Sequence, residues 1–285
     1  MNALGVLLGG LAGLVLAPAA GALAQGLDRR LTARLQRRMG PPLLQPVYDL
    51  AKLWGKQPQR SGAWIGLCAW GCLAGSALAS MLFFAGQDLL LVMLVQAAGA
   101  VFLVLGAMSA PSPYSRTGAQ REVMLMLAYE PVLLLVAACL GLGAGGFTAA
   151  DVLAAPEALL PRLPLAFAAL LVALTVKLRK SPFDAAASAH AHQELVRGVY
   201  TEYSGPHLAL VELAHCFDTA LLLGLCGLFW ATSWWAMVLL AALALVAEIA
   251  VDNACARLTW RAALASAWGA GVVLCVVNLF WLRLG

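Results

Sequence analysis

Four acidic residues lie inside apolar segments of this chain, where charged side chains are rare. Glu130, Glu212, Asp218 and Glu248 each fall within a long run of mostly apolar residues. A charged side chain at the centre of a membrane-spanning helix costs roughly 2.5 to 3.5 kcal/mol, so such groups normally face a protein interior and serve ion or proton movement. The acids therefore predict a buried path for protons.

Helical spacing adds a histidine to this path. Glu212 and His215 are three residues apart, which places them on one helical face, and Asp218 flanks that histidine. The predicted proton-relay residues are Glu130, Glu212, His215, Asp218 and Glu248.

A structural role is the alternative for each of these acids, because polar contacts also hold membrane helices together. For the whole set we favour the relay, since no Lys or Arg is expected at the same depth. Only Asp252, one turn after Glu248, has cationic neighbours, in Arg257 and Arg261.

The composition defines the solvent of these groups. Hydrophobic residues make up 62% of the 285 and charged residues only 11%. Soluble domains carry about 25% charged residues, so a water-soluble globule is excluded. Several apolar runs near the length of a membrane span predict an all-α, polytopic helical membrane protein that forms one integral membrane domain. The short alternating segments of a β-barrel do not occur.

Eight membrane spans are expected, in residues 3–23, 63–85, 89–109, 123–143, 164–176, 207–231, 234–251 and 262–282. With the N-terminus outside, only Arg162 and Arg283 of the 18 cationic residues fall on the outer side. Lys and Arg collect on the cytoplasmic side of membrane proteins. The sequence thus predicts a multi-pass protein of the inner cell membrane. Nucleic-acid binding is not expected, because no aromatic and basic surface accompanies the charge.

The first inner loop, residues 29–60, contains a second kind of helix. Val47, Leu50, Leu53 and Trp54 share one face, with Asp49, Lys52 and Lys56 elsewhere. This pattern is typical of an amphipathic helix at the membrane interface. A simple cationic anchor is the alternative for this loop.

The other long inner loop, residues 177–206, is rich in polar groups and is expected to dock a partner. Its candidate docking residues are Asp184, His190, His192, Glu194, Glu202 and Tyr203. The two histidines form a protonatable pair or a hydrogen-bonded contact to another chain. No metal site is expected, because a third ligand is missing nearby. The seven cysteines include no Cys-x-x-Cys, so iron–sulfur clusters are not expected in this chain either.

Several words of the sequence match a family pattern. They are Gly40-Pro41-Pro42 with Gln45-Pro46, Ala128-Tyr129-Glu130-Pro131, Ser181-Pro182-Phe183-Asp184 and Thr201-Glu202-Tyr203-Ser204-Gly205. They resemble the membrane-anchor subunit shared by respiratory complex I and the energy-converting [NiFe] hydrogenases. The resemblance implies a non-catalytic subunit that anchors a soluble electron-transfer arm and passes protons toward antiporter-like membrane subunits.

The stretch between Asp184 and Leu195 separates the branches of this family. Complex I members carry a glutamate-rich run there, whereas this chain reads Ser-Ala-His-Ala-His-Gln-Glu-Leu-Val. That wording is similar to formate hydrogenlyase subunit 4 and hydrogenase-4 component C. It implies hydrogenase large and small subunits and iron–sulfur proteins as cytoplasmic partners, which would hold the nickel–iron and iron–sulfur centres.

Two other functions stay open at this point. One is a quinone-chamber subunit of a complex I-like NADH-quinone oxidoreductase. The other is a stand-alone ion transporter, a class that often shows internal repeats, and none stands out here.

Overall fold

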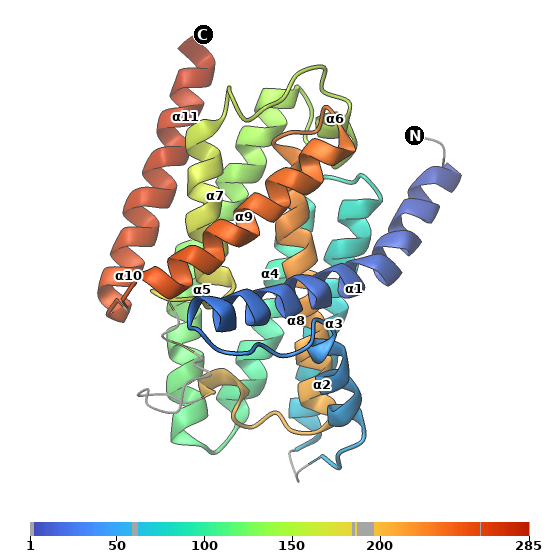
Figure 1. The fold of residues 1–285 in the computed structure, drawn as a ribbon, viewed down its shortest axis with the longest axis vertical. Coiled ribbons are helices and arrows are strands. Elements are labelled where there is room, and N and C mark those ends of the chain that lie inside the picture. Colours follow the sequence, from blue (N-terminus) through green and yellow to red (C-terminus); the bar gives the residue numbers. More distant parts are fainter. Residues whose placement is uncertain (1–2, 59–61, 184–185, 187–196, 257, 285) are drawn as a thin grey trace.

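The fold is described from a computed structural model that covers residues 3–58, 62–183, 186, 197–256 and 258–284. In these ranges the chain forms helices and loops (Figure 1). The helices are α1 (Ala3–Leu35), α2 (Gln45–Trp54), α3 (Ala63–Phe84), α4 (Leu89–Ser109), α5 (Pro113–Ala144), α6 (Ala149–Leu153), α7 (Pro164–Lys177), η1 (Gly198–Tyr200), α8 (Pro206–Leu228), α9 (Trp234–Ala254), α10 (Trp260–Ser266), η2 (Ala267–Val272) and α11 (Val273–Leu284).

The predicted all-α membrane architecture is confirmed, with one difference in the number of full spans. Seven helices of the described ranges are long and apolar enough to cross a membrane, and one of these is the continuous segment from α10 through α11. The expected fifth span is α7, which has only 14 residues. At 1.5 Å per residue it is about 21 Å long, whereas the hydrocarbon core of a bilayer is about 30 Å thick.

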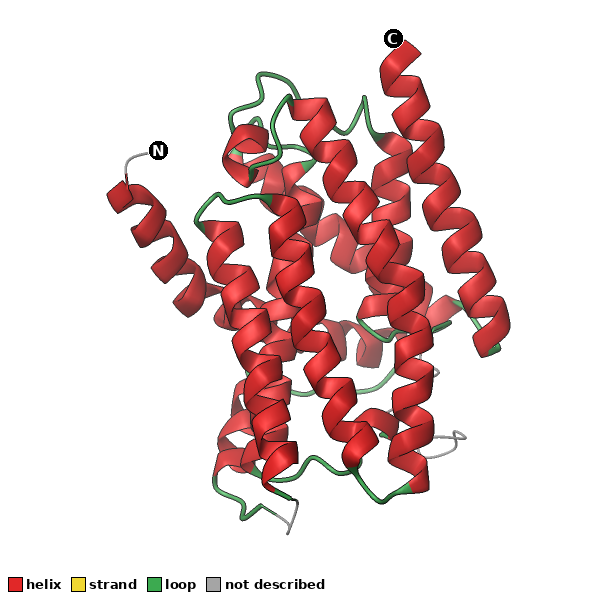
Figure 2. Ribbon diagram, turned by 180° about the vertical axis from the view of Figure 1, so that it is seen from behind, coloured by secondary structure: helices red, strands yellow, loops and turns green. Residues whose placement is uncertain are grey.

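The helices form a bundle around α5 and α8. Seen from behind, the long helices run side by side along the molecule (Figure 2). In contrast, α1 crosses the front of the bundle at a steep angle and packs on α3, α8 and α9 (Figure 1). Gly21 permits this crossing, since a Cβ there would lie 1.9 Å from the carbonyl oxygen of Cys216 on α8.

Two helices are longer than the apolar pattern predicted, because their polar turns lie outside the apolar window. α1 continues beyond residue 23 to Leu35 and carries the first arginines on its final turns. α5 begins at Pro113 rather than at residue 123, since Ser112 accepts a hydrogen bond from the Ser115 amide and Pro113 is favourable in a first turn.

The helix predicted in the first inner loop is present as α2. Pro46 occupies its first turn, and Val47 and Trp54 remain exposed. An ion pair of 2.7 Å between Arg29 Nη1 and Asp49 Oδ2 joins α2 to the end of α1. The two helices therefore form one wall beside the main bundle.

The start of α7 is fixed by a side chain from the last helix. Leu163 precedes α7 and provides no side-chain cap. Instead Asn278 Oδ1 of α11 accepts hydrogen bonds from the backbone amides of Leu165 (3.0 Å) and Ala166 (2.9 Å). Its Nδ2 donates to the carbonyl oxygen of Arg162 at 3.0 Å. Asn278 is fully buried, so α11 positions α7.

Cationic loops gather in one half of the bundle, as the charge pattern predicted. The α4–α5 connection and the segment after α7 lie in the lower half of Figure 1. The α6–α7 connection and the end of α11, which hold Arg162 and Arg283, lie at the upper end.

Candidate functional site

The short helix α7 places cationic side chains inside the bundle. Lys177, its last residue, is buried, and its Nζ lies 3.0 Å from Glu130 Oε1 on α5. The same ammonium group stands 4.6 Å from the centroid of the Tyr129 ring. A buried charge is tolerated when it is paired, and an aromatic face adds further attraction. Glu130 is therefore the anionic partner of a buried lysine.

Arg179 forms the second pair, with Glu122 on one side and Tyr200 on the other. Its Nε and Nη2 donate to the two carboxylate oxygens of Glu122, at 3.0 and 2.7 Å. Two parallel hydrogen bonds of this kind are the strongest arrangement for an arginine and a carboxylate. Arg179 Nη1 also donates to the Tyr200 hydroxyl. Burial raises the pKa of Tyr200 although the cation opposes the shift, so this hydroxyl stays protonated.

A third ion pair joins the segment after α7 to α1. Lys180 Nζ is 2.8 Å from Asp28 Oδ1, and the lysine side chain is only 9% exposed. The predicted inner loop therefore contributes another cation to the interior.

The acids of α9 bind to α7 and to the segment that follows it. Glu248 is buried and accepts a hydrogen bond from the Thr175 hydroxyl at 3.1 Å. Asp252, one turn further, accepts from the Ser181 amide at 2.8 Å. Arg257, one of its expected neighbours, lies outside the described residues.

The prediction that the acids lack cations at their own depth was wrong. Lys177 and Arg179 had been assigned to an inner loop, whereas α7 is so short that both lie deep in the bundle. The length of the fifth apolar segment, well under a full span, was the available signal. Glu122, expected on the same side of its helix as Glu130, is indeed paired from the same direction.

The polar face of α8 completes the line of groups. Gln96 Nε2 of α4 donates to Asp218 Oδ1 at 3.0 Å. Gln25 of α1 donates to the Thr219 hydroxyl at 3.2 Å. These amides were not predicted, because a neutral polar residue in an apolar helix gives no distinct sequence signal. His215 precedes Asp218 by one turn of α8, as the spacing predicted.

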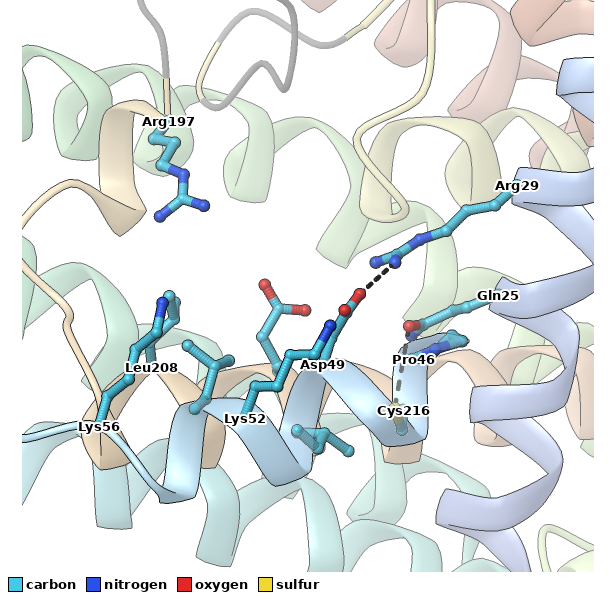
Figure 3. Close-up of a pocket in the computed structure, with 12 residues that line it drawn as sticks. Gln25, Arg29, Pro46, Asp49, Lys52, Lys56, Arg197, Leu208 and Cys216 are labelled. Atoms are coloured by element: carbon cyan, nitrogen blue, oxygen red, sulfur yellow. Dashed lines mark hydrogen bonds and ion pairs between the residues drawn. The ribbon is translucent and has the colours of Figure 1, made fainter. Parts of the chain in front are cut away.

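Two adjoining cavities reach this line from the basic half of the bundle. One, of about 320 Å³, lies between α1, α2 and α8 (Figure 3). The other, of about 360 Å³, extends toward Arg179 and His215. Both are lined by Gln25, Arg29, Arg197, Leu208 and Glu212. We call the two together the polar vestibule.

A smaller cavity lies further inside. It measures about 20 Å³ and is lined by Lys177, Arg179, His215 and Asp218, among others. A polar space needs roughly 10 to 15 Å³ to hold one water molecule. Water can therefore connect the α8 groups with the cations of α7.

The predicted docking loop is only partly described. Asp184, His190, His192 and Glu194 lie outside the described residues. Glu202 is exposed just after η1. Tyr203 is buried instead of facing outward, and its hydroxyl donates to the carbonyl oxygen of Leu103 at 2.9 Å. This tyrosine anchors the end of the loop to α4.

Comparison with known proteins gives relatives in both expected branches. The chain is 32% identical to hydrogenase-4 component C of Escherichia coli over 67% of this chain, and the match covers 64% of that relative, slightly less than two thirds. It is also 32% identical to an NADH-quinone oxidoreductase membrane subunit of Cereibacter sphaeroides, the second of its H type, over 95% of each chain.

The fold has a solved counterpart in an archaeal respiratory membrane complex, the membrane-bound sulfane sulfur reductase. One chain of that complex superposes with a TM-score of 0.82 at 24% identity, covering 98% of this chain and 99% of its own length. The pattern of the NADH dehydrogenase family matches residues 10–283. This protein therefore belongs to the NADH dehydrogenase family, as the resemblance of its motifs implied.

Proposed function

We propose that this chain is the membrane subunit of an energy-converting hydrogenase complex of the formate hydrogenlyase or hydrogenase-4 type. In this role it anchors a soluble electron-transfer arm and passes protons toward antiporter-like membrane subunits. The observation that carries the proposal is the line of carboxylates and cations that begins at the polar vestibule and ends in the middle of the bundle. Buried ionisable groups that face a bundle interior are typical of proton paths.

The geometry supports a direction for this path. Protons enter the polar vestibule at Glu212, which lines both of its cavities. His215 and Asp218 follow along α8, and the small inner cavity connects them with Lys177 and Glu130. Glu248 lies on a separate branch beside Thr175.

Docking of the soluble arm is assigned to the basic half of the molecule, on loops 29–60 and 177–206. This half faces the cytoplasm of the inner membrane and the N-terminus faces outside, because Lys and Arg collect on the cytoplasmic side. The hydrogenase large and small subunits and iron–sulfur proteins dock there. Their nickel–iron and iron–sulfur centres perform the electron transfer.

A quinone-chamber subunit is the second candidate, favoured by the 95% coverage of the NADH-quinone oxidoreductase relative. The lining of the vestibule argues against it. Ligand pockets are mostly apolar, whereas six of the twelve residues that line the cavity in Figure 3 are charged: Arg29, Asp49, Lys52, Lys56, Arg197 and Glu212. Reduction of a quinone analogue by the purified complex, blocked by a quinone-site inhibitor, would decide for this candidate.

The relay is tested with Glu130→Gln and Glu212→Gln in the whole complex. Glutamine keeps the shape and hydrogen-bonding capacity of glutamate but cannot carry the proton. We expect both variants to assemble on native gels and to lose most proton uptake into sealed vesicles. Glu157→Gln is the control, since Glu157 is exposed at the opposite end of the bundle. Normal uptake in both test variants would refute the relay.

A further inference from the structure

One lysine faces two carboxyl groups at the inner end of the polar line. Lys177 is 3.0 Å from Glu130 Oε1, and it lines the small inner cavity together with Asp218. Asp218 is also close enough to interact electrostatically with the ammonium group. The lysine side chain is only 5% exposed and that of Glu130 15%. The three groups therefore share a nearly closed space.

The nearest other cation is already committed. Arg179 donates two hydrogen bonds to the Glu122 carboxylate and a third to Tyr200. Lys177 is then left with two carboxyl groups and a single positive charge. Leaving an unpaired carboxylate in the interior costs several kcal/mol, and a group in that position takes up a proton instead.

We infer that Glu130, Lys177 and Asp218 form a site that holds one exchangeable proton, and that the position of the lysine decides which carboxyl group carries it. In this structure the lysine is paired with Glu130, so Asp218 carries the proton. The contact from Gln96 agrees, because its amide donates to Asp218 Oδ1 and leaves the other oxygen to hold the proton.

Transfer exchanges the two arrangements. The ammonium group swings from Glu130 toward Asp218 while the O–H bond of Asp218 breaks and an O–H bond forms on Glu130. Water in the inner cavity carries the proton between them. The net charge of the site is unchanged, so no charge is left uncompensated at either end. As a step of the relay this inference rests on the proposed function, but the shared proton itself does not.

Other ionisable groups surround the site and have to be separated from it. On α3, α5, η1 and α8 they are Cys72, Glu122, Tyr129, Tyr200, Glu212 and His215. His215 is the main competitor, because a charged imidazole would let both carboxyl groups ionise.

The test is infrared spectroscopy of the purified complex at neutral pH, in H₂O and in D₂O. The wild type should show the carbonyl band of a protonated carboxyl group that shifts on deuteration. Asp218→Asn should remove this band. Glu130→Gln should remove it as well, because Lys177 then pairs with Asp218 and ionises it. Glu157→Gln should change nothing, since its carboxylate is exposed.

Lys177→Met supplies an independent arm if either carboxyl variant fails to assemble. Without the cation both carboxyl groups should be protonated, so one additional band is expected. A band that persists in Glu130→Gln, or in Asp218→Asn, would overturn the inference, the latter placing the proton on another group such as His215. No gain of a band in Lys177→Met would also overturn it. Expected bands together with normal proton uptake in the Gln variants would refute the relay and leave the shared site standing.

Discussion

Replacement of Asn278 by Ala should detach the start of α7 from α11. The substitution removes two hydrogen bonds accepted from the amides of Leu165 and Ala166 and one donated to Arg162. Side-chain hydrogen bonds in membrane proteins average about 0.6 kcal/mol and reach about 1.7. Three of them give an expected loss of roughly 2 to 5 kcal/mol. The upper part of this range applies if the freed amides find no water, because Asn278 is fully buried.

Asn278→Asp is the matched variant. A carboxylate still accepts from both amides and is favoured at a helix N-terminus, but it cannot donate to Arg162. We therefore expect a smaller loss than for Ala. Unfolding of the detergent-solubilised protein by SDS measures both, with fluorescence of Trp268 and Trp281 on the last span as the local signal. Equal losses for Ala and Asp, or a loss below about 0.5 kcal/mol for Ala, would refute the capping role.

Two further predictions concern the cations and the topology. Arg179→Lys should lower the stability of the complex by about 1 to 3 kcal/mol, because an ammonium group cannot make the paired contact to Glu122; thermal unfolding measures this, and an unchanged midpoint would contradict it. Cys255 is the exposed one of the seven cysteines, so a membrane-impermeant maleimide should modify it in inside-out vesicles and leave it unmodified in intact cells. Labelling in intact cells would reverse the proposed orientation.

The sequence predicted the helical spans and the acids well, because both are local signals. Apolar runs of full length set the positions of α3 and α4 within a residue, and acids in such runs stand out from their neighbours. The partners could not be predicted in the same way. Lys177 and Glu130 are 47 residues apart, and Arg179 and Glu122 are 57 apart.

Such pairs depend on where α7 ends in space, and hydropathy alone does not give that position. Asn278 shows the same limit, since a single amide in an apolar helix cannot be recognised as the cap of another helix 112 and 113 residues away. The resemblance to a known family supplied the overall function class but none of these contacts.

The shortness of α7 has a consequence for how the protein is made. A segment of 14 residues is too short to be accepted into the bilayer on its own account, and cations follow it directly. Its final depth depends on Glu130 from α5, which is synthesised earlier, and on Asn278 from α11, which is synthesised later. The interior site is therefore completed only after the last helix has entered the membrane, so a partly inserted chain has no continuous proton path.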